Sequence, residues 1–365
     1  MARDPVGGAE AVEFRGVTKR YGDVVAVNRV SFAIERATLV TLLGPSGCGK
    51  TTTLRLIAGL ELATEGEIRI GGRDVTRRPA TERNVSMVFQ SYALFPHMTV
   101  IENVAYGPLV TGASRTRAHE QAREKLALVG LQGLDARLPS ELSGGQQQRV
   151  AVARALVLEP EVLCFDEPLS NLDAKLRRRV REDIRELQQR LGLTVAYVTH
   201  DQQEALAVSD RIIVMDHAAI AQSGTPRELY EAPASLFVAD FVGDSNLVDA
   251  ELTSRNGVAG RVRLGEIELS LPHRGAAAGP VKVAVRPESL RLFTASPAGP
   301  ALEGRIAKAA YLGTHMEYTV STAVGELFVV DRSVTRPAPA GTPVWVAFED
   351  HGVTVVPDRD RPPTS

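Results

Sequence analysis

The stretch GPSGCGKTT at residues 44–52 has the composition of a phosphate-binding loop. It follows the apolar run LVTLL and precedes TLRLIAGL, which has the pattern of a helix. Gly44, Gly49, Lys50 and Thr51 match G-x-x-x-x-G-K-[ST], which in a strand–loop–helix context binds a nucleoside triphosphate. Glycines let successive backbone N–H groups surround an anion, and the N-terminus of the next helix adds positive charge. A glycine turn that binds nothing is the alternative, and the flanking strand and helix argue against it.

The side chains of this loop have predictable roles. Lys50 is expected to reach the β- and γ-phosphates, and the hydroxyl of Thr51 is expected to ligate Mg²⁺. The predicted phosphate-binding residues are Gly44, Ser46, Gly47, Cys48, Gly49, Lys50, Thr51 and Thr52.

A second group of candidate residues stands in VLCFDEP, where an apolar strand ends in Asp166 and Glu167. Ligands of open α/β sheets bind at the carboxyl ends of strands. In phosphoryl transfer, such an aspartate helps hold Mg²⁺, and a neighbouring carboxylate activates water. We therefore assign Asp166 to the metal and Glu167 to general base catalysis. Two acids that merely close a strand at the surface are the alternative, which Pro168, the following SNLD and the upstream loop disfavour.

The third group is LSGGQQQR, in which Ser143, Gly144 and Gly145 precede an apolar-periodic segment. Exposed backbone donors at such a helix N-terminus form a second anion site. The residues alone leave a second reading open, because the same pattern also describes a capped helix that follows a flexible loop.

The segments between these motifs alternate between strands and helices from Val12 to about Gly243, which predicts a parallel sheet covered by helices. The expected strands are residues 12–17, 39–43, 86–90, 162–167, 194–200 and 211–215. The clearest helix is AKLRRRVREDIRELQQRLG, which Gly192 is placed to end. Its apolar face is expected to consist of Leu176, Val180, Ile184, Leu187 and Leu191.

The composition changes after Asp244, where short β-rich runs alternate with turns that contain glycine and proline. This pattern predicts a small all-β barrel of the OB-like type. The expected organisation is an α/β P-loop nucleotide-binding domain at residues 1–243 and an all-β domain at 244–356. The polar, proline-rich residues 357–365 are expected to form a disordered tail.

The bulk composition restricts the function classes. The chain has 365 residues and a net charge of -2, which gives no overall attraction to nucleic acid or to anionic lipid. We expect no export signal, and the sequence has no run of about 18 apolar residues, so work at a membrane is expected to require a partner. Cys48 and Cys164 lie in the nucleotide motifs, which favours a reducing compartment over a disulfide.

GPSGCGKTT, LSGGQQQR, CFDEP, SNLD and VTHD, in this order, resemble the ATP-binding subunit of an ABC transporter. The resemblance implies that ATP and Mg²⁺ are bound between two copies of the chain that associate head to tail. In this arrangement the residues Ser143, Gly144 and Gly145 of one copy close on the γ-phosphate held by Lys50 of the other. This arrangement would explain why each subunit has a second anion-binding loop in addition to the one at residues 44–52.

The resemblance assigns four more residues. Tyr21 in KRYGD is similar to the aromatic residue that stacks on adenine, and Gln90 is similar to the glutamine that senses the metal and the attacking water. Asp173 in SNLD matches a loop that crosses the dimer interface, and His200 matches the histidine that contacts the γ-phosphate. The chain departs from the family pattern at Ala37 and Thr38, where Gly-Glu is usual, and at Ala218, where a turn glycine is usual.

The C-terminal segment around AVRPESLRL resembles the TOBE domain of importer ATPases, and this indicates import. The expected partners are integral membrane permease subunits and, indirectly, an extracytoplasmic solute-binding protein. The expected location is the cytoplasmic face of the inner membrane, where the chain is bound peripherally. The phrases SYALFPHMTV and FVADFVGDSN favour polyamine or ferric iron as the solute, ahead of phosphonate, sulfate or sugar.

Two other function classes compete with this reading. One is a soluble ABC-type ATPase that acts on DNA or ribosomes, and the absence of a long heptad array and of net positive charge disfavours it. The other is an ATPase that regulates a ligand-binding or nucleic-acid-binding β domain, and the low aromatic content of 5% disfavours base stacking. No nucleic-acid partner is expected.

Overall fold

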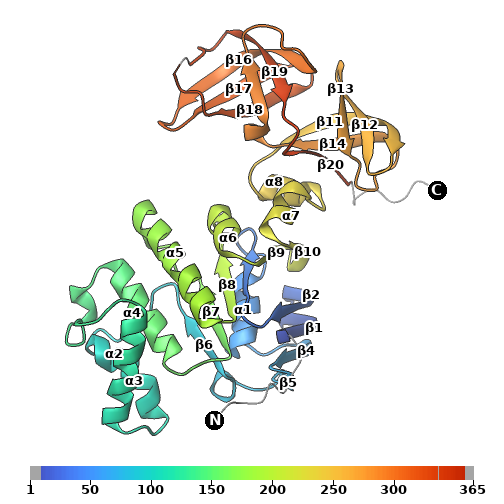
Figure 1. Ribbon diagram of the computed structural model, residues 1–365. Coiled ribbons are helices and arrows are strands. Elements are labelled where there is room, and N and C mark those ends of the chain that lie inside the picture. Colours follow the sequence, from blue (N-terminus) through green and yellow to red (C-terminus); the bar gives the residue numbers. More distant parts are fainter. Residues whose placement is uncertain (1–9, 336, 358–365) are drawn as a thin grey trace. The chain divides into compact units, whose positions relative to one another are not determined.

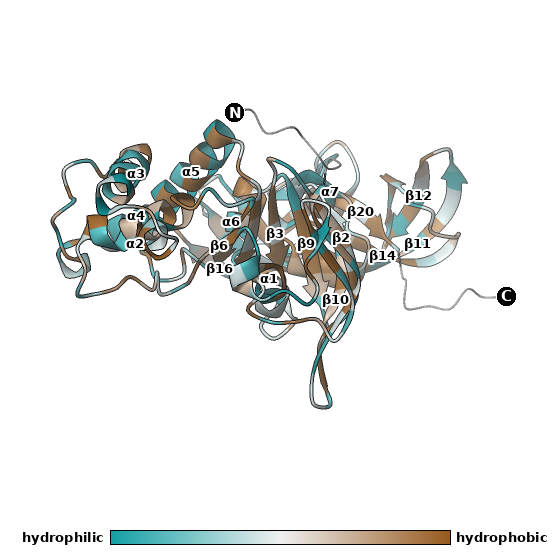
Figure 2. Ribbon diagram, turned by 90° about the horizontal axis from the view of Figure 1, so that it is seen from below, coloured by the Kyte–Doolittle hydropathy of each residue, from teal (hydrophilic) through white to brown (hydrophobic). Residues whose placement is uncertain are grey.

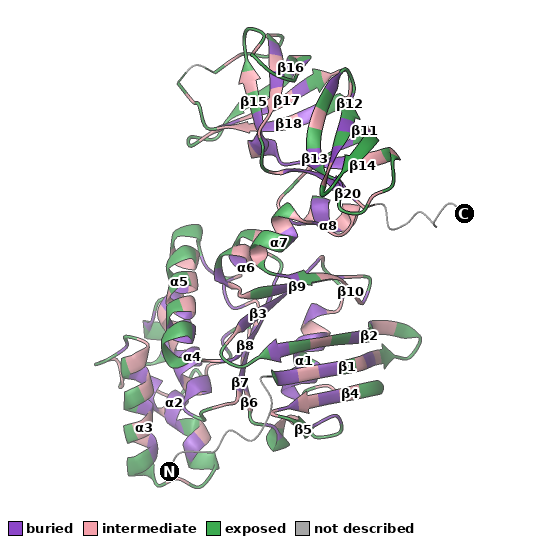
Figure 3. Cartoon of the chain, turned by 45° about the vertical axis from the view of Figure 1, so that its right-hand side comes forward, coloured by how far each residue is buried: buried purple, intermediate pink, exposed green. Residues whose placement is uncertain are grey.

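The computed structural model describes residues 10–335 and 337–357. Its central element is a six-stranded sheet in the order β10-β9-β3-β8-β7-β6. The strands are β3 (Leu39–Leu43), β6 (Val85–Val88), β7 (Val162–Asp166), β8 (Val195–Thr199), β9 (Arg211–Asp216) and β10 (Ala219–Gly224). β9, β3, β8, β7 and β6 run parallel, and β10 pairs antiparallel with β9 at one edge. β3 and β8 are buried along their whole length, as Figure 3 shows, which explains their continuous apolar sequences.

The predicted placement of residues 12–17 in the parallel sheet is wrong. They belong to β1 (Glu10–Tyr21), which forms a separate antiparallel sheet with β2 (Val24–Glu35), β4 (Glu65–Ile70) and β5 (Arg73–Asp74). Only Gly22 and Asp23 separate β1 from β2, and Tyr21 pairs with Val24 across this turn. A two-residue connection joins antiparallel strands, whereas parallel strands need a crossover of a dozen residues or more.

Helices cover the parallel sheet and form a cluster beside it (Figure 1). They are α1 (Lys50–Ala58), α2 (Val100–Val110), α3 (Arg115–Leu128), α4 (Gly144–Leu156), α5 (Ala174–Leu191) and α6 (Gln202–Val208), with short 3₁₀ turns at Ala80–Glu82, Pro139–Glu141 and Pro287–Ser289. α2, α3 and α4 share one apolar cluster. Figure 2 shows apolar residues concentrated in the strands and hydrophilic residues on outer faces of α3 and α5.

α5 agrees with its predicted pattern. Val180, Ile184 and Leu187 are buried in the core between α5 and the sheet. Leu191 is 38% exposed because it lies in the last turn, and Gly192 then ends the helix with a φ of 59°.

The contacts within the chain define two compact units, residues up to Pro226 and residues from Arg227 onward. α8 (Leu236–Phe241) and almost all of α7 (Pro226–Glu231) therefore group with the β-rich unit, whereas the predicted boundary after residue 243 follows them. The buried Arg286 explains this grouping. Its guanidinium donates to the backbone oxygens of Tyr230, Ala239, Gly243 and Asp244, and burial lowers its pKa to about 10.

The second unit contains two five-stranded antiparallel sheets that share one apolar core. One has the order β13-β12-β11-β14-β20, and the other has the order β15-β19-β16-β17-β18. Their strands are β11 (Asn246–Asn256), β12 (Ala259–Leu264), β13 (Ile267–Pro272), β14 (Gly279–Val285), β15 (Leu290–Phe293), β16 (Ala301–Tyr311), β17 (Met316–Thr322), β18 (Gly325–Asp331), β19 (Pro343–Phe348) and β20 (Val353–Val356). The all-β prediction is confirmed. Of the predicted tail, residues 358–365 lie outside the described residues.

Replacing Ala37 by glycine is expected to stabilise the first unit by about 1 kcal/mol. Ala37 is exposed and has a φ of 59°, a left-handed conformation that an alanine side chain disfavours. Its backbone is held there because its N–H donates to Thr194 and its carbonyl accepts from Gln188.

Denaturant unfolding of Ala37→Gly measures this gain. The exposed Ala174, whose helical position favours alanine, serves as the control, because Ala174→Gly should lower stability. Equal losses in the two variants would contradict the strain assigned to Ala37.

Candidate functional site

The predicted site residues follow the carboxyl ends of adjacent parallel strands. Gly44 follows β3, Gln90 follows β6, Glu167 follows β7 and His200 follows β8. These four strands are neighbours in the order β3-β8-β7-β6, so their carboxyl ends lie at one edge of the sheet. Residues that are far apart in the sequence are thereby brought to a single surface, where open α/β sheets bind their ligands.

The loop between β3 and α1 requires glycine for two reasons. A Cβ at Gly44 would lie 2.3 Å from the carbonyl oxygen of Met215, and a Cβ at Gly49 would lie 2.4 Å from that of Ala26. Gly49 also has a φ of 103°, which side-chain-bearing residues rarely adopt. The loop is therefore packed between two backbone segments, and α1 begins directly after it.

Lys50 is buried at the first position of α1, with its ammonium group turned back over the loop. Its Nζ donates to the carbonyl oxygens of Gly44 and Pro45, each at 2.7 Å. The Sγ of Cys48 lies 3.8 Å from the same nitrogen, and burial raises the pKa of this thiol. The structure thus places a positive charge inside the curve of the loop.

Thr51 and Asp166 are brought together across a sequence separation of 115 residues. The Thr51 hydroxyl donates to Oδ1 of Asp166 at 3.4 Å. Burial raises the pKa of Asp166, and the nearby Glu167 acts in the same direction. Arg55, one turn further along α1, opposes this shift. A hydroxyl and a carboxylate at this spacing offer the hard oxygen ligands that Mg²⁺ prefers.

Glu167 has a strained backbone, with a φ of 45° in a residue other than glycine. Its N–H donates to the carbonyl of Val198 at 3.0 Å, and its carbonyl accepts from Ser170. Its Oε2 lies 3.2 Å from Nδ1 of His200, which follows the neighbouring strand. Strain of this kind is retained where surrounding contacts hold it, and it concentrates at functional sites.

Gln90 contacts the loop that follows Glu167. Its Nε2 donates to Oγ of Ser170 at 3.0 Å, and its carbonyl accepts from Nδ2 of Asn171 at 3.0 Å. The segment after Gln90 continues through left-handed residues Tyr92 and Ala93, whose carbonyls both accept from Arg154 of α4.

Ser143, Gly144 and Gly145 form a capped helix start that packs on the loop containing Asp173. Ser143 and Gln146 form a reciprocal capping box at the start of α4. A Cβ at Gly145 would lie 2.9 Å from Leu176, and one at Gly144 would lie 3.1 Å from Leu172. A side chain at either position would therefore displace the end of one of these leucines, so the two glycines favour close packing of the start of α4 on the residues around Asp173.

Asp173 caps α5 by accepting from the backbone N–H groups of Lys175 and Leu176. Among the hydrogen bonds of the described residues, none joins Ser143, Gly144, Gly145 or Asp173 to the loop at 44–52. The structure of one chain thus brings together the residues of the strand edge and leaves the α4 loop outside that group.

Tyr21 lies at the end of β1 with 45% of its surface exposed. The Nζ of Lys19 lies 4.6 Å from its ring centroid, and the same ammonium forms an ion pair with Glu61 at 2.8 Å. Burial and a hydrogen bond with Glu61 raise the pKa of its hydroxyl, while Thr52 also contacts that hydroxyl. The ring therefore stands beside the start of α1, with a large part of its surface open to a ligand.

The sequence comparisons agree with this geometry. Residues 27–170 match the ABC transporter family, and residues 283–356 match the TOBE domain. A protein of Rhizobium etli, named Fe(3+) ions import ATP-binding protein FbpC, is 60% identical over 94% of this chain and 97% of its own length. The chain belongs to the ABC transporter family. A protein of the same name from Vibrio cholerae is 46% identical over 95% of the chain and 97% of its own length.

Solved structures of ABC cassettes share the fold of the first unit. A structure described as a dimeric post-hydrolysis state of the cassette MJ0796 bound to ADP and Pi is 32% identical, with a TM-score of 0.53. It covers 59% of this chain and 99% of that one. The prediction of an ATP-binding, ATP-hydrolysing ABC importer subunit with a C-terminal TOBE domain is confirmed. Across residues 10–335 and 337–357, no helix combines the length and the apolar character needed to cross a bilayer.

Several contacts of this ABC ATPase were not predicted. Arg55 was not singled out, although it opposes the rise in the pKa of Asp166 that burial causes. Its place one turn after Thr51 was the available signal. Ser170 was only part of the motif SNLD, and its link to Gln90 depends on the pairing of β6 with β7. Glu204 was missed because a lone glutamate in a helix gives no sign of burial.

Glu204 forms a buried hydrogen-bond group next to His200. It is 4% exposed and accepts hydrogen bonds from the hydroxyls of Tyr197 and Thr199. Burial raises its pKa. Since Thr199 immediately precedes His200, Glu204 is in a place to hold the backbone of the histidine.

Truncating Glu204 to alanine is expected to destabilise the first unit by about 2–4 kcal/mol, because the hydroxyls of Tyr197 and Thr199 lose their acceptor. Urea unfolding measures the change. Glu182→Ala is the matched control, because this exposed glutamate of α5 forms a surface pair with Arg178, and its loss should cost at most about 0.5 kcal/mol. Similar losses in both variants would show that Glu204 has no special structural role.

Proposed function

We propose that this chain is the ATPase subunit of a ferric-iron importer and that it works as a head-to-tail pair. The supporting observation is the identity of 57–60% over almost the whole chain to proteins named Fe(3+) ions import ATP-binding protein FbpC. Ferric iron was one of the two solutes that the sequence favoured, with polyamine as the other.

In this proposal, the loop at 44–52 binds the phosphates of ATP, and Tyr21 stacks on adenine. Lys50 is already positioned inside the loop and is free to exchange its two carbonyl contacts for phosphate oxygens. The exposed face of the Tyr21 ring is suited to a flat base.

Thr51, Asp166 and Gln90 are the proposed protein ligands of Mg²⁺, directly or through water. The fit rests on the Thr51–Asp166 contact at 3.4 Å and on the position of Gln90 after the neighbouring strand. Mg²⁺ commonly uses one or two carboxylates together with phosphate oxygens and waters, and this set provides one carboxylate. When bound, the metal ion neutralises charge on the phosphates.

Glu167 is the proposed general base, and His200 and Gln90 complete the catalytic group. The carboxylate of Glu167 takes the proton of the attacking water, and His200 fixes this carboxylate from one side through the 3.2 Å contact. Gln90 is tethered to Ser170, whose hydroxyl and N–H both donate to the Glu167 carbonyl. A shift of Gln90 is therefore transmitted to the base.

The second copy supplies Ser143, Gly144 and Gly145 to each ATP, and Asp173 lies at the same interface. The capping box uses the N–H groups of Ser143 and Gln146, so those of Gly144 and Gly145 are left to bind an anion at the start of α4. Closure of the pair around ATP is a rigid-body movement that permease helices docked near Gln90 can follow.

The proposed assembly consists of two such chains with integral membrane permease subunits at the cytoplasmic face of the inner membrane. An extracytoplasmic solute-binding protein delivers the ferric ion to the permease. The ferric ion is cargo that the permease and the binding protein recognise, and the ATPase subunit does not contact it.

Solute uptake by a deletion strain of the source organism tests this assignment. We expect loss of the gene to abolish most uptake of ⁵⁵Fe(III) and to leave ¹⁴C-spermidine uptake unchanged. Wild-type protein should restore iron uptake, whereas Glu167→Gln should not. Loss of spermidine uptake with normal iron uptake would overturn the ferric-iron assignment in favour of polyamine.

A further inference from the structure

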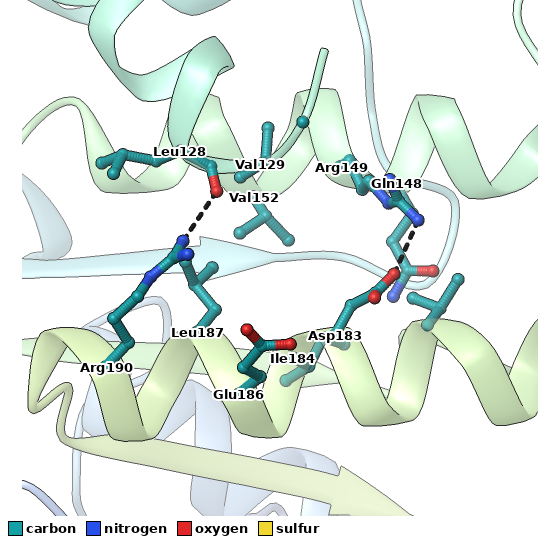
Figure 4. Close-up of a pocket in the computed structure, with 12 residues that line it drawn as sticks. Leu128, Val129, Gln148, Arg149, Val152, Asp183, Ile184, Glu186, Leu187 and Arg190 are labelled. Atoms are coloured by element: carbon teal, nitrogen blue, oxygen red, sulfur yellow. Dashed lines mark hydrogen bonds and ion pairs between the residues drawn. The ribbon is translucent and has the colours of Figure 1, made fainter.

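α4 and α5 enclose a cleft that is separate from the strand edge described above. The cleft has a volume of about 200 Å³, and the end of α3 closes one side of it. Its lining combines polar side chains with apolar ones, which include Val152 of α4 and Ile184 and Leu187 of α5. Figure 4 shows side chains of both helices extending into the space between them. A cavity of about 150 Å³ is large enough for benzene, so this cleft has room for one substituted ring.

Gln148 of α4 is a buried polar group without a partner in this cleft. Its side chain is fully buried, and neither its Oε1 nor its Nε2 has a hydrogen-bond partner among the described residues. Buried amides are nearly always paired, and an unpaired one costs free energy. An occupant that pairs with both atoms would remove this cost.

The charged side chains at the rim of the cleft have a net formal charge of zero, and several of them already have partners. Arg149 pairs with Asp183 at 2.7 Å, and Arg190 donates to the carbonyl of Leu128 at 2.9 Å. Glu186 is exposed at the same rim, so two positive and two negative side chains surround the opening. The formal charges cancel, which favours a neutral occupant.

The amide of Gln148 determines the polar group that such an occupant carries. A carboxamide offers N–H donors and a carbonyl acceptor side by side, so its best partner has an adjacent acceptor and donor. Another carboxamide, or a lactam edge, has this pattern. A carboxylate has no donor and an ammonium has no acceptor, so each leaves one atom of Gln148 unpaired.

We propose that the cleft between α4 and α5 is a binding site for a small neutral molecule that carries a carboxamide or lactam group on an apolar ring. The amide pairs with Gln148, and the ring packs against Val152, Ile184 and Leu187. The site joins the helix that begins after Ser143 to the helix that begins after Asp173, so its occupant contacts both. The inference is independent of which solute is transported.

Titration of benzamide into the full chain with ¹³C-labelled methyl groups tests the site. We expect saturable shifts of the Val152, Ile184 and Leu187 methyl resonances, with a Kd on the order of 1 mM for so small a molecule. Acetophenone has the same ring and carbonyl but no N–H donor, and it should bind at least about 5-fold more weakly. If the cleft holds only water, benzamide will cause no saturable shift of these resonances. That result would overturn the proposal.

Gln148→Leu separates amide pairing from simple filling of the cleft. The variant keeps the volume of the side chain, and we expect it to weaken benzamide binding at least about 10-fold. Gln132→Leu, at an exposed position, should bind benzamide as the wild type does. Equal affinity in Gln148→Leu and the wild type would exclude the proposed pairing.

The melting temperature of Gln148→Leu gives a second test that does not depend on a ligand. Replacing an unpaired buried amide by an apolar group of similar size should raise Tm by about 2 °C or more. A lower Tm would show that Gln148 has a partner within the folded protein, and it would contradict the proposal.

Discussion

Replacing Glu167 by glutamine is expected to lower the rate of ATP hydrolysis by about 10²–10⁴-fold, the usual contribution of a general base. The amide cannot accept the proton of the attacking water. Binding of ATP should persist, because the phosphate loop at 44–52 and Tyr21 are untouched. The change is nearly isosteric, so the 3.2 Å approach to His200 and the backbone of the loop should be retained.

Two measurements distinguish a lost base from a damaged site. ATP affinity is measured by equilibrium binding, and the dimer is followed by size-exclusion chromatography with Mg-ATP present. We expect Glu167→Gln to accumulate as an ATP-bound dimer, since closure occurs and the reaction that would reopen the pair does not. Glu159→Gln is the control, because this exposed glutamate pairs with Lys125 at the surface. Hydrolysis by Glu167→Gln at the wild-type rate would assign the base to another residue.

Substituting alanine for Lys50 is expected to weaken ATP binding by at least about 100-fold, or about 3 kcal/mol, because the triphosphate loses a charged partner in a partly buried site. Hydrolysis should then become undetectable at ATP concentrations that saturate the wild type. The position of the ammonium group inside the loop makes this the largest single effect on binding that we expect.

Lys50→Ala also removes two hydrogen bonds to the carbonyls of Gly44 and Pro45, so loop distortion must be separated from lost charge. Lys50→Met keeps the length and the buried carbon chain, and it should show the same loss of ATP binding. Lys308→Ala changes an exposed lysine of β16 and should leave binding unchanged. Wild-type affinity in Lys50→Met would mean that the charge does not bind the triphosphate.

Much of the fold could be predicted because its signals are local. β3, β7 and β8 are buried on both faces, so their apolar runs identify them without knowledge of their partners. α5 has a regular apolar spacing and a terminal glycine. The error at residues 12–17 arose because the sequence of an apolar strand does not show whether the neighbouring strand is parallel or antiparallel to it. The short turn at Gly22 was a usable signal for an antiparallel pair.

The residues of the candidate site also differ in how far the sequence alone could identify them. The loop at 44–52 is continuous in sequence, so its glycines, Lys50 and Thr51 were assigned from spacing alone as the expected phosphate-binding residues. Gln90, Asp173 and His200 depended on resemblance to a family, because a lone polar residue after a strand has no distinctive pattern. Glu204 and Gln148 could not be found, since burial of a polar side chain depends on packing between elements that are distant in the chain.

The amino-acid sequence by itself determined which residues of this chain we propose to bind phosphate and where its buried strands lie, because those patterns depend on neighbours within a few positions. The tertiary structure decided which strand ends meet. The order β3-β8-β7-β6 places Glu167 beside His200 and Thr51 beside Asp166. The packing of α4 against α5 leaves the Gln148 amide without a hydrogen-bond partner among the described residues. Both outcomes follow from the pairing of distant segments, which is selected by the burial of the whole core rather than by any local pattern.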